Sequence, residues 1–379
     1  MHDVLLYALP IFLACMLLEW AWGRWRGRDT YGLADTLNSL SQGLLSQAVA
    51  LLTPLLQSGL YAALQPRIAL LPASLWSGLW GTLGAVLMYD FCDYWLHRVS
   101  HESAIFWAAH AVHHQSEHFN LSTALRQESF YSVMGWPFFL PMALLGVPTD
   151  QFLLAGIVVL FYQFWVHTEH IGRLGWLDRV FTTPSNHRVH HAVNPPYLDR
   201  NYAAILVLWD RLFGSFAEER EPCVYGTVKP LASWNPLGAV GQVYGELWRR
   251  MRLTPRLVDK LRVLFKSPAW LPPGVPALPE ASPAERLAQP RYDPPASRAA
   301  RTLAVVVFLA QGGLAVAWLD GAETQGLPAL LGTAAALLAG LWCAGALLES
   351  GPAPTLRRLS LLTLAGLTLA GAPLLTLPL

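Results

Sequence analysis

The chain has 379 residues, of which 54% are hydrophobic and only 13% are charged. A soluble domain carries about 25% charged residues, so this composition leaves too little polar surface for a water-facing chain and predicts a polytopic membrane protein. The net charge of +1 and the lack of a basic stripe argue against a nucleic-acid partner. The four cysteines form no CxxC pair, which excludes a disulfide framework or a cysteine zinc site.

Apolar runs predict an all-α fold built on membrane helices. Each run is close to the ~20 residues that a bilayer requires. The eight runs are 4–22, 36–63, 75–96, 130–147, 150–170, 300–319, 327–348 and 356–377. The run 130–147 is short, and the alternative is a re-entrant helix. Residues 171–297 contain no such run: they include an amphipathic piece at 239–252 and a Pro-rich surface linker at 266–297.

Arginines that flank these runs predict the topology. With eight spans they all fall on one side of the membrane, which the positive-inside rule makes cytoplasmic. We expect an integral, multi-pass protein of a bacterial inner membrane, without a cleavable signal because residues 1–22 lack a basic start and a small-residue cleavage site. The arginines are Arg24, Arg26, Arg28, Arg98, Arg173, Arg179, Arg249, Arg250, Arg252, Arg256, Arg301, Arg357 and Arg358.

Nine of the twelve histidines form a pattern with metal-ligand spacing. An i,i+4 pair places two imidazoles on one helix face, and each H-x2-HH triplet adds a neighbour turned by about 100° that reaches a second metal. All nine fall on the predicted cytoplasmic side. They are the pair His97 and His101, the triplet His110, His113 and His114, the triplet His187, His190 and His191, and the single His167.

Neutral imidazole is a good ligand for iron, zinc, copper and nickel. Two metals with four or five ligands each require eight to ten donors. The nine histidines meet that number together with Gln163, which lies one helical turn before His167 and contributes through water. His118 is expected in a loop and His2 is uninformative, whereas His170 stays open as an additional ligand.

Carboxylates lie near these histidines in the sequence. Asp93 is four residues and Asp90 seven residues before His97, and both are candidates to accept the second N–H of a ligand histidine. Glu102 and Asp199 are further candidates. Arg126 is open between holding a polar substrate head and snorkelling to the interface. No HExxH, GxSxG, Walker or GxGxxG motif is present, so reducing equivalents are expected from an external donor.

These motifs resemble the fatty acid hydroxylase/sterol desaturase superfamily of membrane di-iron proteins over roughly residues 80–230. Within it, the chain is most similar to the subgroup that oxygenates alkylglycerol ether lipids. Supporting stretches are Asn120–Gln127, Gln163–Glu169, Thr183–His191, Asp199–Tyr202, Trp209–Gly214 and Cys223–Gly226. Asn186 is a departure, because relatives often carry a histidine there.

The resemblance implies two iron ions in a cytoplasmic histidine-rich cap, with O2-dependent hydroxylation of a lipid C–H bond, such as the ether-adjacent carbon of an alkylglycerol. It implies tetrahydrobiopterin as the external electron donor and adds Asp199 and Asn201 to the candidate catalytic residues. The expected organisation is N-terminal membrane helices over 1–70, a catalytic region over 71–235, an amphipathic and Pro-rich cytoplasmic segment over 236–297 and C-terminal membrane helices over 298–379.

Two alternatives remain at this point. A lipid, sterol or carotenoid desaturase or hydroxylase would use the same site and differ only in its product. A membrane metal transporter belongs to another class. Transport requires polar ligands inside the spans, whereas these histidines are expected at span ends and in the cap.

Overall fold

The computed structural model describes residues 2–53, 57–277, 285, 288–321, 325–351 and 355–374. In this part of the chain every regular element is a helix, apart from an isolated bridge between Ala192 and Tyr225, so the predicted all-α class is confirmed. The helices are α1 (His2–Trp25), α2 (Leu33–Leu52), α3 (Gln57–Ile68), η1 (Ala73–Trp76), α4 (Gly78–Glu102), α5 (Ala104–His114), α6 (Leu121–Ala124), α7 (Tyr131–Gly135), η2 (Trp136–Phe139), α8 (Leu140–Leu144), α9 (Thr149–Trp165), η3 (Leu177–Arg179), α10 (Pro184–His190), α11 (Leu208–Phe213), α12 (Pro236–Leu253), α13 (Leu257–Phe265), α15 (Arg298–Gly321), α16 (Leu327–Leu348) and α17 (Leu356–Leu374).

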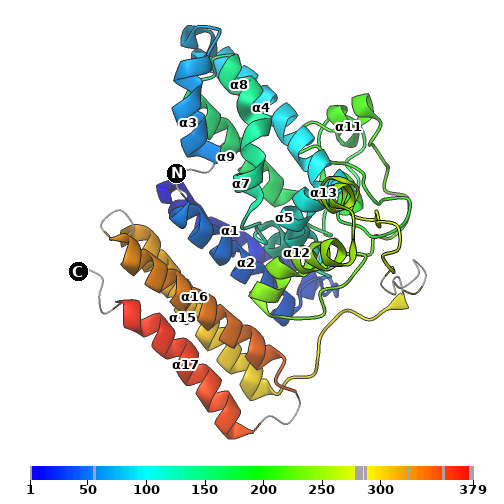
Figure 1. The fold of residues 1–379 in the computed structure, drawn as a ribbon. Coiled ribbons are helices and arrows are strands. Elements are labelled where there is room, and N and C mark those ends of the chain that lie inside the picture. The colour runs from blue at the N-terminus through cyan, green and yellow to red at the C-terminus, as the bar shows by residue number, and fades with distance from the viewer. Residues whose placement is uncertain are drawn as a thin grey trace.

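The C-terminal helices α15, α16 and α17 pack together as a bundle, and α2 packs against α15 and α16 (Figure 1). Helices α15 and α16 are long and apolar enough to cross a membrane. A polar contact ties the bundle together, because the buried Gln311 side chain donates a hydrogen bond to the carbonyl of Gly366 at 2.9 Å. A Cβ atom on Gly340 would lie only 1.9 Å from Nε2 of Gln311, so a larger residue there would force the Gln311 side chain to move.

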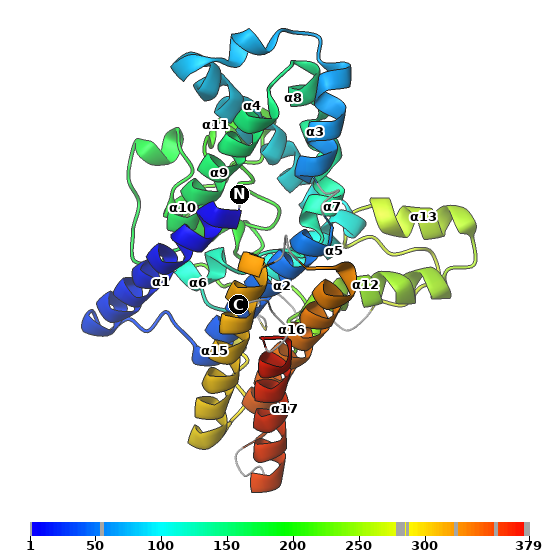
Figure 2. The same ribbon diagram turned by 90° about the vertical axis from the view of Figure 1, so that its left-hand side faces the viewer.

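A second group of helices, α3, α4, α8 and α9, lies apart from the C-terminal bundle in both ribbon views (Figures 1 and 2). Its core includes Phe139, Met142 and Phe152. The expected run 36–63 is interrupted here: α2 ends at Leu52, and Thr53 has a non-helical backbone because it precedes a proline. Residues 54–56 lie outside the described part.

The segment 130–147 contains three short helical pieces, α7, η2 and α8, with Pro137 and Pro141 starting the second and third. Residues 131–144 reach about 21 Å at ~1.5 Å per residue, less than the ~30 Å of a bilayer core. The re-entrant alternative therefore fits this segment better than a full crossing. The expected surface linker at 266–297 is irregular where it is described, and 278–284 with 286–287 lie outside the described residues.

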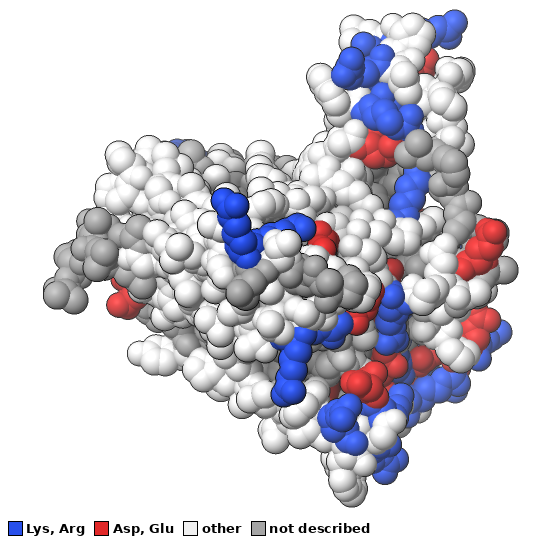
Figure 3. Space-filling model, turned by 90° about the horizontal axis from the view of Figure 1, so that it is seen from below, with Lys and Arg blue, Asp and Glu red and all other residues white. Residues whose placement is uncertain are grey.

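Helices α5, α10, α11, α12 and α13, with the loops that join them, form a cap beside the end of α4 that carries His97 and His101 (Figure 1). Between α9 and α12 the chain has only short helices, so side-chain bonds to the backbone hold it in place. Asp90 on α4 accepts hydrogen bonds from the backbone N–H groups of Ile205 and Leu206 and from the indole of Trp209. In Figure 3 charged side chains gather on one half of the molecule, and the other half is largely uncharged.

Candidate metal centre

All nine histidines of the sequence pattern are buried and converge on one place in the cap. They form two clusters, and within each cluster the candidate ligand nitrogens lie within 4.8 Å of one another. Cluster A contains His97, His101, His110, His114 and His190, and cluster B contains His113, His167, His187 and His191.

Each H-x2-HH triplet is divided between the two clusters. On α5, His110 and His114 face cluster A while His113 faces cluster B. At about 100° per residue, positions i and i+4 differ by only about 40°, whereas i+3 lies about 100° from i+4. The triplet at α10 uses the same geometry in reverse, since His187 and His191 enter cluster B and His190 enters cluster A.

The outer nitrogens of two cluster B rings are held by backbone carbonyls, which can only accept. In cluster B, Nδ1 of His113 donates to the carbonyl of Arg126 at 3.0 Å, and Nδ1 of His167 donates to the carbonyl of Gln163 at 2.7 Å. A neutral imidazole carries one N–H, so in both rings the Nε2 atom is left with a lone pair.

Those two Nε2 atoms nevertheless lie 3.3 Å apart. Two lone pairs at this distance repel unless a cation lies between them, and convergent neutral imidazoles are what Fe, Zn and Cu bind. Further Nε2 atoms meet in the same way, at 3.0 Å for His187 and His167 and at 3.0 Å for His97 and His110. Buried Nε2 atoms of His101 and His190 have no hydrogen-bond partner in the described part of the chain. The donor set therefore fits metal ions.

Burial keeps the ligands in the state that a metal requires. It lowers the pKa of His113 to about 4, and repulsion among the neighbouring rings adds to this effect elsewhere. The rings whose pKa is lowered in this way are therefore neutral at pH 7. Burial also lowers the pKa well below the usual 6.5 in His110, His114, His187, His190 and His191.

A short loop supports cluster A through its backbone. The carbonyl of Tyr202 accepts from Nδ1 of His97 at 2.6 Å, and the carbonyl of Arg200 accepts from Nδ1 of His190 at 3.0 Å. Asp199 and Asn201 both have φ of 55°, the left-handed region that Asn and Asp tolerate better than most residues. The two accepting carbonyls, of Arg200 and Tyr202, each belong to the residue that follows a left-handed position.

Asn201 also locks the loop with its side chain. It donates to the carbonyls of Asn186 and Ala217 and accepts from the N–H of Ala217. Asp210 accepts from the N–H groups of Tyr202 and Ala203. The candidate Asn201 therefore lies behind the histidines and acts on them through the backbone.

The other expected site residues have varied positions. The Asp90 carboxylate holds the 205–209 turn. The side-chain amide of Gln163 donates to Asp93 at 3.3 Å, so only the backbone carbonyl of Gln163 contacts His167. Asp199 is largely exposed, with its carboxylate 3.6 Å from Nδ1 of His101. Glu102 is half exposed and pairs with Arg98 at 3.0 Å, outside both clusters.

The two residues whose roles the sequence left open, His170 and Arg126, have partners outside the clusters. His170 contacts the Thr30 hydroxyl and lies in neither cluster. Arg126 is 1% exposed, so it neither snorkels nor faces a lipid: it donates to the Val112 carbonyl and to Asn38 and Gln115. The flanking arginine Arg188 pairs with Glu219 at 2.7 Å. At the departure from the family pattern, Asn186 forms a capping box with Thr183 at the start of α10.

One supporting residue lacked a clear signal in the sequence. Oε1 of Glu128 lies 2.6 Å from Nδ1 of His110, eighteen residues away along the chain. It is one of several acidic residues near the histidines, and only the fold selects it. Aromatic rings also pack on the clusters, with Trp107 against His101 and Phe119 against His191.

The comparisons with known proteins agree with this geometry. Residues 82–215 match the family model described as fatty acid hydroxylase. Alkylglycerol monooxygenase of Homo sapiens is 39% identical over 280 residues, covering 73% of this chain and 62% of that protein. Its counterpart in Danio rerio is 39% identical over 267 residues, covering 70% and 59%. Ornithine lipid hydroxylase OlsE of Rhizobium tropici is 30% identical over 223 residues, covering 56% and 65%. No solved structure matches the chain.

Residues 82–215, which hold all nine histidines, therefore form a domain of the fatty acid hydroxylase type. The particular proteins that the chain resembles are the alkylglycerol monooxygenases. The chain spans 62% and 59% of the length of the two relatives above.

Proposed function

We propose that this protein is a membrane di-iron monooxygenase that uses O2 to hydroxylate a C–H bond of a lipid, at the ether-adjacent carbon of an alkylglycerol. The observation that carries this proposal is the facing pair of lone-pair nitrogens on His113 and His167, 3.3 Å apart in a buried site. The fatty acid hydroxylase domain and the alkylglycerol monooxygenase relatives supply the reaction class.

In this proposal cluster A holds one iron with five histidines and cluster B holds the other with four. When bound, the irons supply the activation of O2 by electrons from outside the chain. The protein's own residues hold the imidazoles of His97, His190, His113 and His110 in one orientation, through the carbonyls of Tyr202, Arg200 and Arg126 and the carboxyl group of Glu128. Burial excludes water from the reacting carbon.

The proposed catalytic region is 71–235. The candidate catalytic residues in it differ in the groups that they contact. Asn201 and Asp90 position the loop behind cluster A, and Asp93 and Gln163 position His167 behind cluster B. Asp199 faces His101 from the surface, and Glu102 fixes Arg98 at the end of α4. A lipid delivered from the bilayer is hydroxylated, and a hydroxylated ether carbon is a hemiacetal that separates into an aldehyde and an alcohol.

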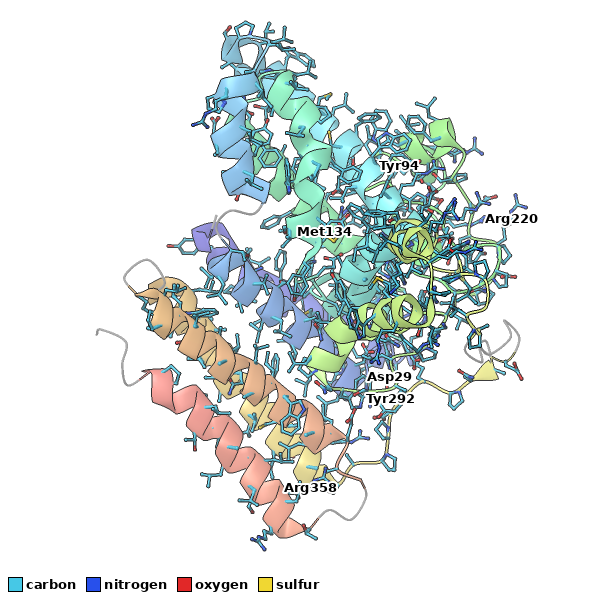
Figure 4. The ribbon with its side chains drawn as sticks, in the orientation of Figure 1. Asp29, Tyr94, Met134, Arg220, Tyr292 and Arg358 are labelled. Carbon is cyan, nitrogen blue, oxygen red and sulfur yellow. The ribbon has the colours of Figure 1, made fainter. Side chains whose placement is uncertain are left out.

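Electrons come from an external donor, which we propose is tetrahydrobiopterin, as the family resemblance suggests. We further propose a multi-pass protein of a bacterial inner membrane with the cap in the cytoplasm. Support comes from the apolar helices α15 and α16 and from basic residues at the predicted span ends. In Figure 4, Tyr94 and Arg220 lie in the upper right part of the view, and Asp29 and Tyr292 lie below them.

The test is an O2-consumption assay of the iron-loaded protein with an alkylglycerol and reduced tetrahydrobiopterin, followed by mass spectrometry of the products. We expect O2 uptake matched by fatty aldehyde, and neither in His113→Ala. An alkene or a ring alcohol from other lipids would identify the desaturase or hydroxylase alternative. Iron binding without O2 uptake in the presence of every donor and lipid would overturn the proposal.

A further inference from the structure

Helix α13 exposes an apolar stripe to the surroundings although it lies in the polar half of the chain. Leu257 and Phe265 are 73% and 63% exposed, and Val258 and Leu261 are also exposed. At about 100° per residue these four side chains cover one continuous face of the helix. Single exposed leucines are common in proteins, but four on one helix face mark an interaction surface.

The opposite face of α13 is already occupied. Val263 is buried in a small core with Ala104 and Ala108 of α5 and Leu247 of α12. Asp259 is buried on the same side and pairs with Arg262 at 3.0 Å. The exposed stripe is therefore a second apolar face, separate from the one that folds the helix onto the cap.

Cations border the exposed stripe. Between Leu253 and Ser267 the chain has one carboxylate, the buried Asp259, and four cations, Arg256, Lys260, Arg262 and Lys266. In Figure 2, α12 and α13 lie side by side and project from the edge of the molecule. A projecting arm in Figure 3 carries more Lys and Arg than Asp and Glu side chains. An apolar stripe with a basic border complements a bilayer surface that contains anionic lipid.

The end of α13 lies beside the end of α4, which carries the expected span 75–96. The first half of α4 exposes apolar side chains, including Leu79, Trp80 and Leu83, as a lipid-facing span does. Its last turn reaches Ser103, whose hydroxyl donates to the carbonyl of Leu264 in α13. The next N–H, that of Ala104, donates to the carbonyl of Lys266 at 2.9 Å. Two hydrogen bonds thus tie the end of α13 to the junction between α4 and α5.

We propose that α13 is an interfacial helix that docks on the anionic lipid surface of the bilayer that α4 crosses. Leu257, Val258, Leu261 and Phe265 enter the boundary between headgroups and acyl chains, and Arg256 and Lys266 contact anionic headgroups. Since the junction at Ser103 separates the two histidines of α4 from the three of α5, the docked helix braces the two ligand helices against the membrane.

The experiment uses the full-length protein in lipid nanodiscs, made of phosphatidylcholine alone or with phosphatidylglycerol. A fluorescent non-canonical amino acid replaces Leu261 in one variant and Arg220 in a control, because Arg220 is 80% exposed at the outer edge of the cap (Figure 4). We expect headgroup-region nitroxide lipids to quench most of the emission at position 261 and aqueous iodide to quench the emission at position 220.

Charge reversal tests the anionic partner. Arg256→Glu with Lys266→Glu is expected to abolish the increase in lipid quenching that phosphatidylglycerol causes at position 261, while Arg220→Glu leaves that increase unchanged. Equal iodide quenching at positions 261 and 220 in anionic nanodiscs would overturn the proposal. So would protection of position 261 from both quenchers together with energy transfer between two labelled copies, because a second copy would then cover the stripe.

Discussion

The Nδ1 atom of His110 lies 2.6 Å from Oε1 of Glu128, so a carboxyl group supports this histidine where backbone carbonyls support His97 and His190. Burial raises the pKa of Glu128 to about 8. A positive charge in cluster A would favour the ionised form of this carboxyl group, which couples the two through the ring of His110.

Replacing Glu128 tests that support. Glu128→Ala is expected to lower iron affinity or activity by about 10–100-fold, the usual cost of losing an outer partner of a metal-bound histidine. Glu128→Gln keeps an acceptor oxygen at the same place and should retain most of both. Iron titration and turnover measure the effect, and Glu218→Ala, at a half-exposed surface carboxylate, is the control. Equal losses in the Ala and Gln variants would contradict a hydrogen-bonding role.

The division of each triplet predicts unequal effects within α5 and α10. His113→Ala leaves cluster B with three histidines, whereas His190→Ala leaves cluster A with four. We therefore expect His113→Ala to bind one iron fewer per chain and His190→Ala to keep more of its iron. Metal analysis after extensive dialysis checks this order, and two full equivalents of iron in His113→Ala would contradict the ligand assignment.

The left-handed conformation of Asn201 predicts a stability effect. Asn201→Ala loses three side-chain hydrogen bonds, and alanine tolerates a positive φ less well than asparagine does. Together these should cost about 2–4 kcal/mol of unfolding free energy. Thermal unfolding in nanodiscs measures the loss. Asp199→Gly, at the exposed partner position with the same φ, should unfold within a few degrees of the parent protein.

A pH effect is expected at Glu246 on α12. Burial acts to raise the pKa of this carboxyl group, but hydrogen bonds from Arg249 and Arg250 outweigh it and lower the pKa to about 2. A lowered folded-state pKa stabilises the fold above the ordinary value of 4.5, and this stability is lost as the pH falls from 4.5 through 2.

Glu246→Gln should therefore be less stable than the parent by about 0.5–1 kcal/mol at pH 7, after screening by solvent, and equal to it near pH 2. The difference in melting temperature between the two proteins across pH 2–7 is the measurement. A difference that does not change with pH would contradict an ionic origin.

Histidine spacing predicted eight of the nine cluster members, because helical periodicity decides which side chains share a face, and His167 was predicted from its place at the end of an apolar run. It also anticipated that each triplet is divided between two groups of ligands. Composition predicted the all-α class, and the apolar runs located α15 and α16. These features depend on local sequence and were accessible without the fold.

Contacts between segments that lie far apart in the sequence could not be predicted from local patterns. Arg126 is buried because Asn38 on α2 and Gln115 after α5 both meet its guanidinium, and no local pattern reports that meeting. Glu128 was indistinguishable from other acidic residues nearby. The supporting carbonyls of Arg200 and Tyr202 could not be predicted from side-chain type, because every residue has a backbone carbonyl.

The shared triplets have a consequence for the spacing of the two clusters. Because α5 and α10 each contribute to both, the clusters cannot separate unless a helical turn unwinds. The distance between the two clusters is therefore fixed by the pitch of the two helices. It stays the same while the surrounding loops fluctuate.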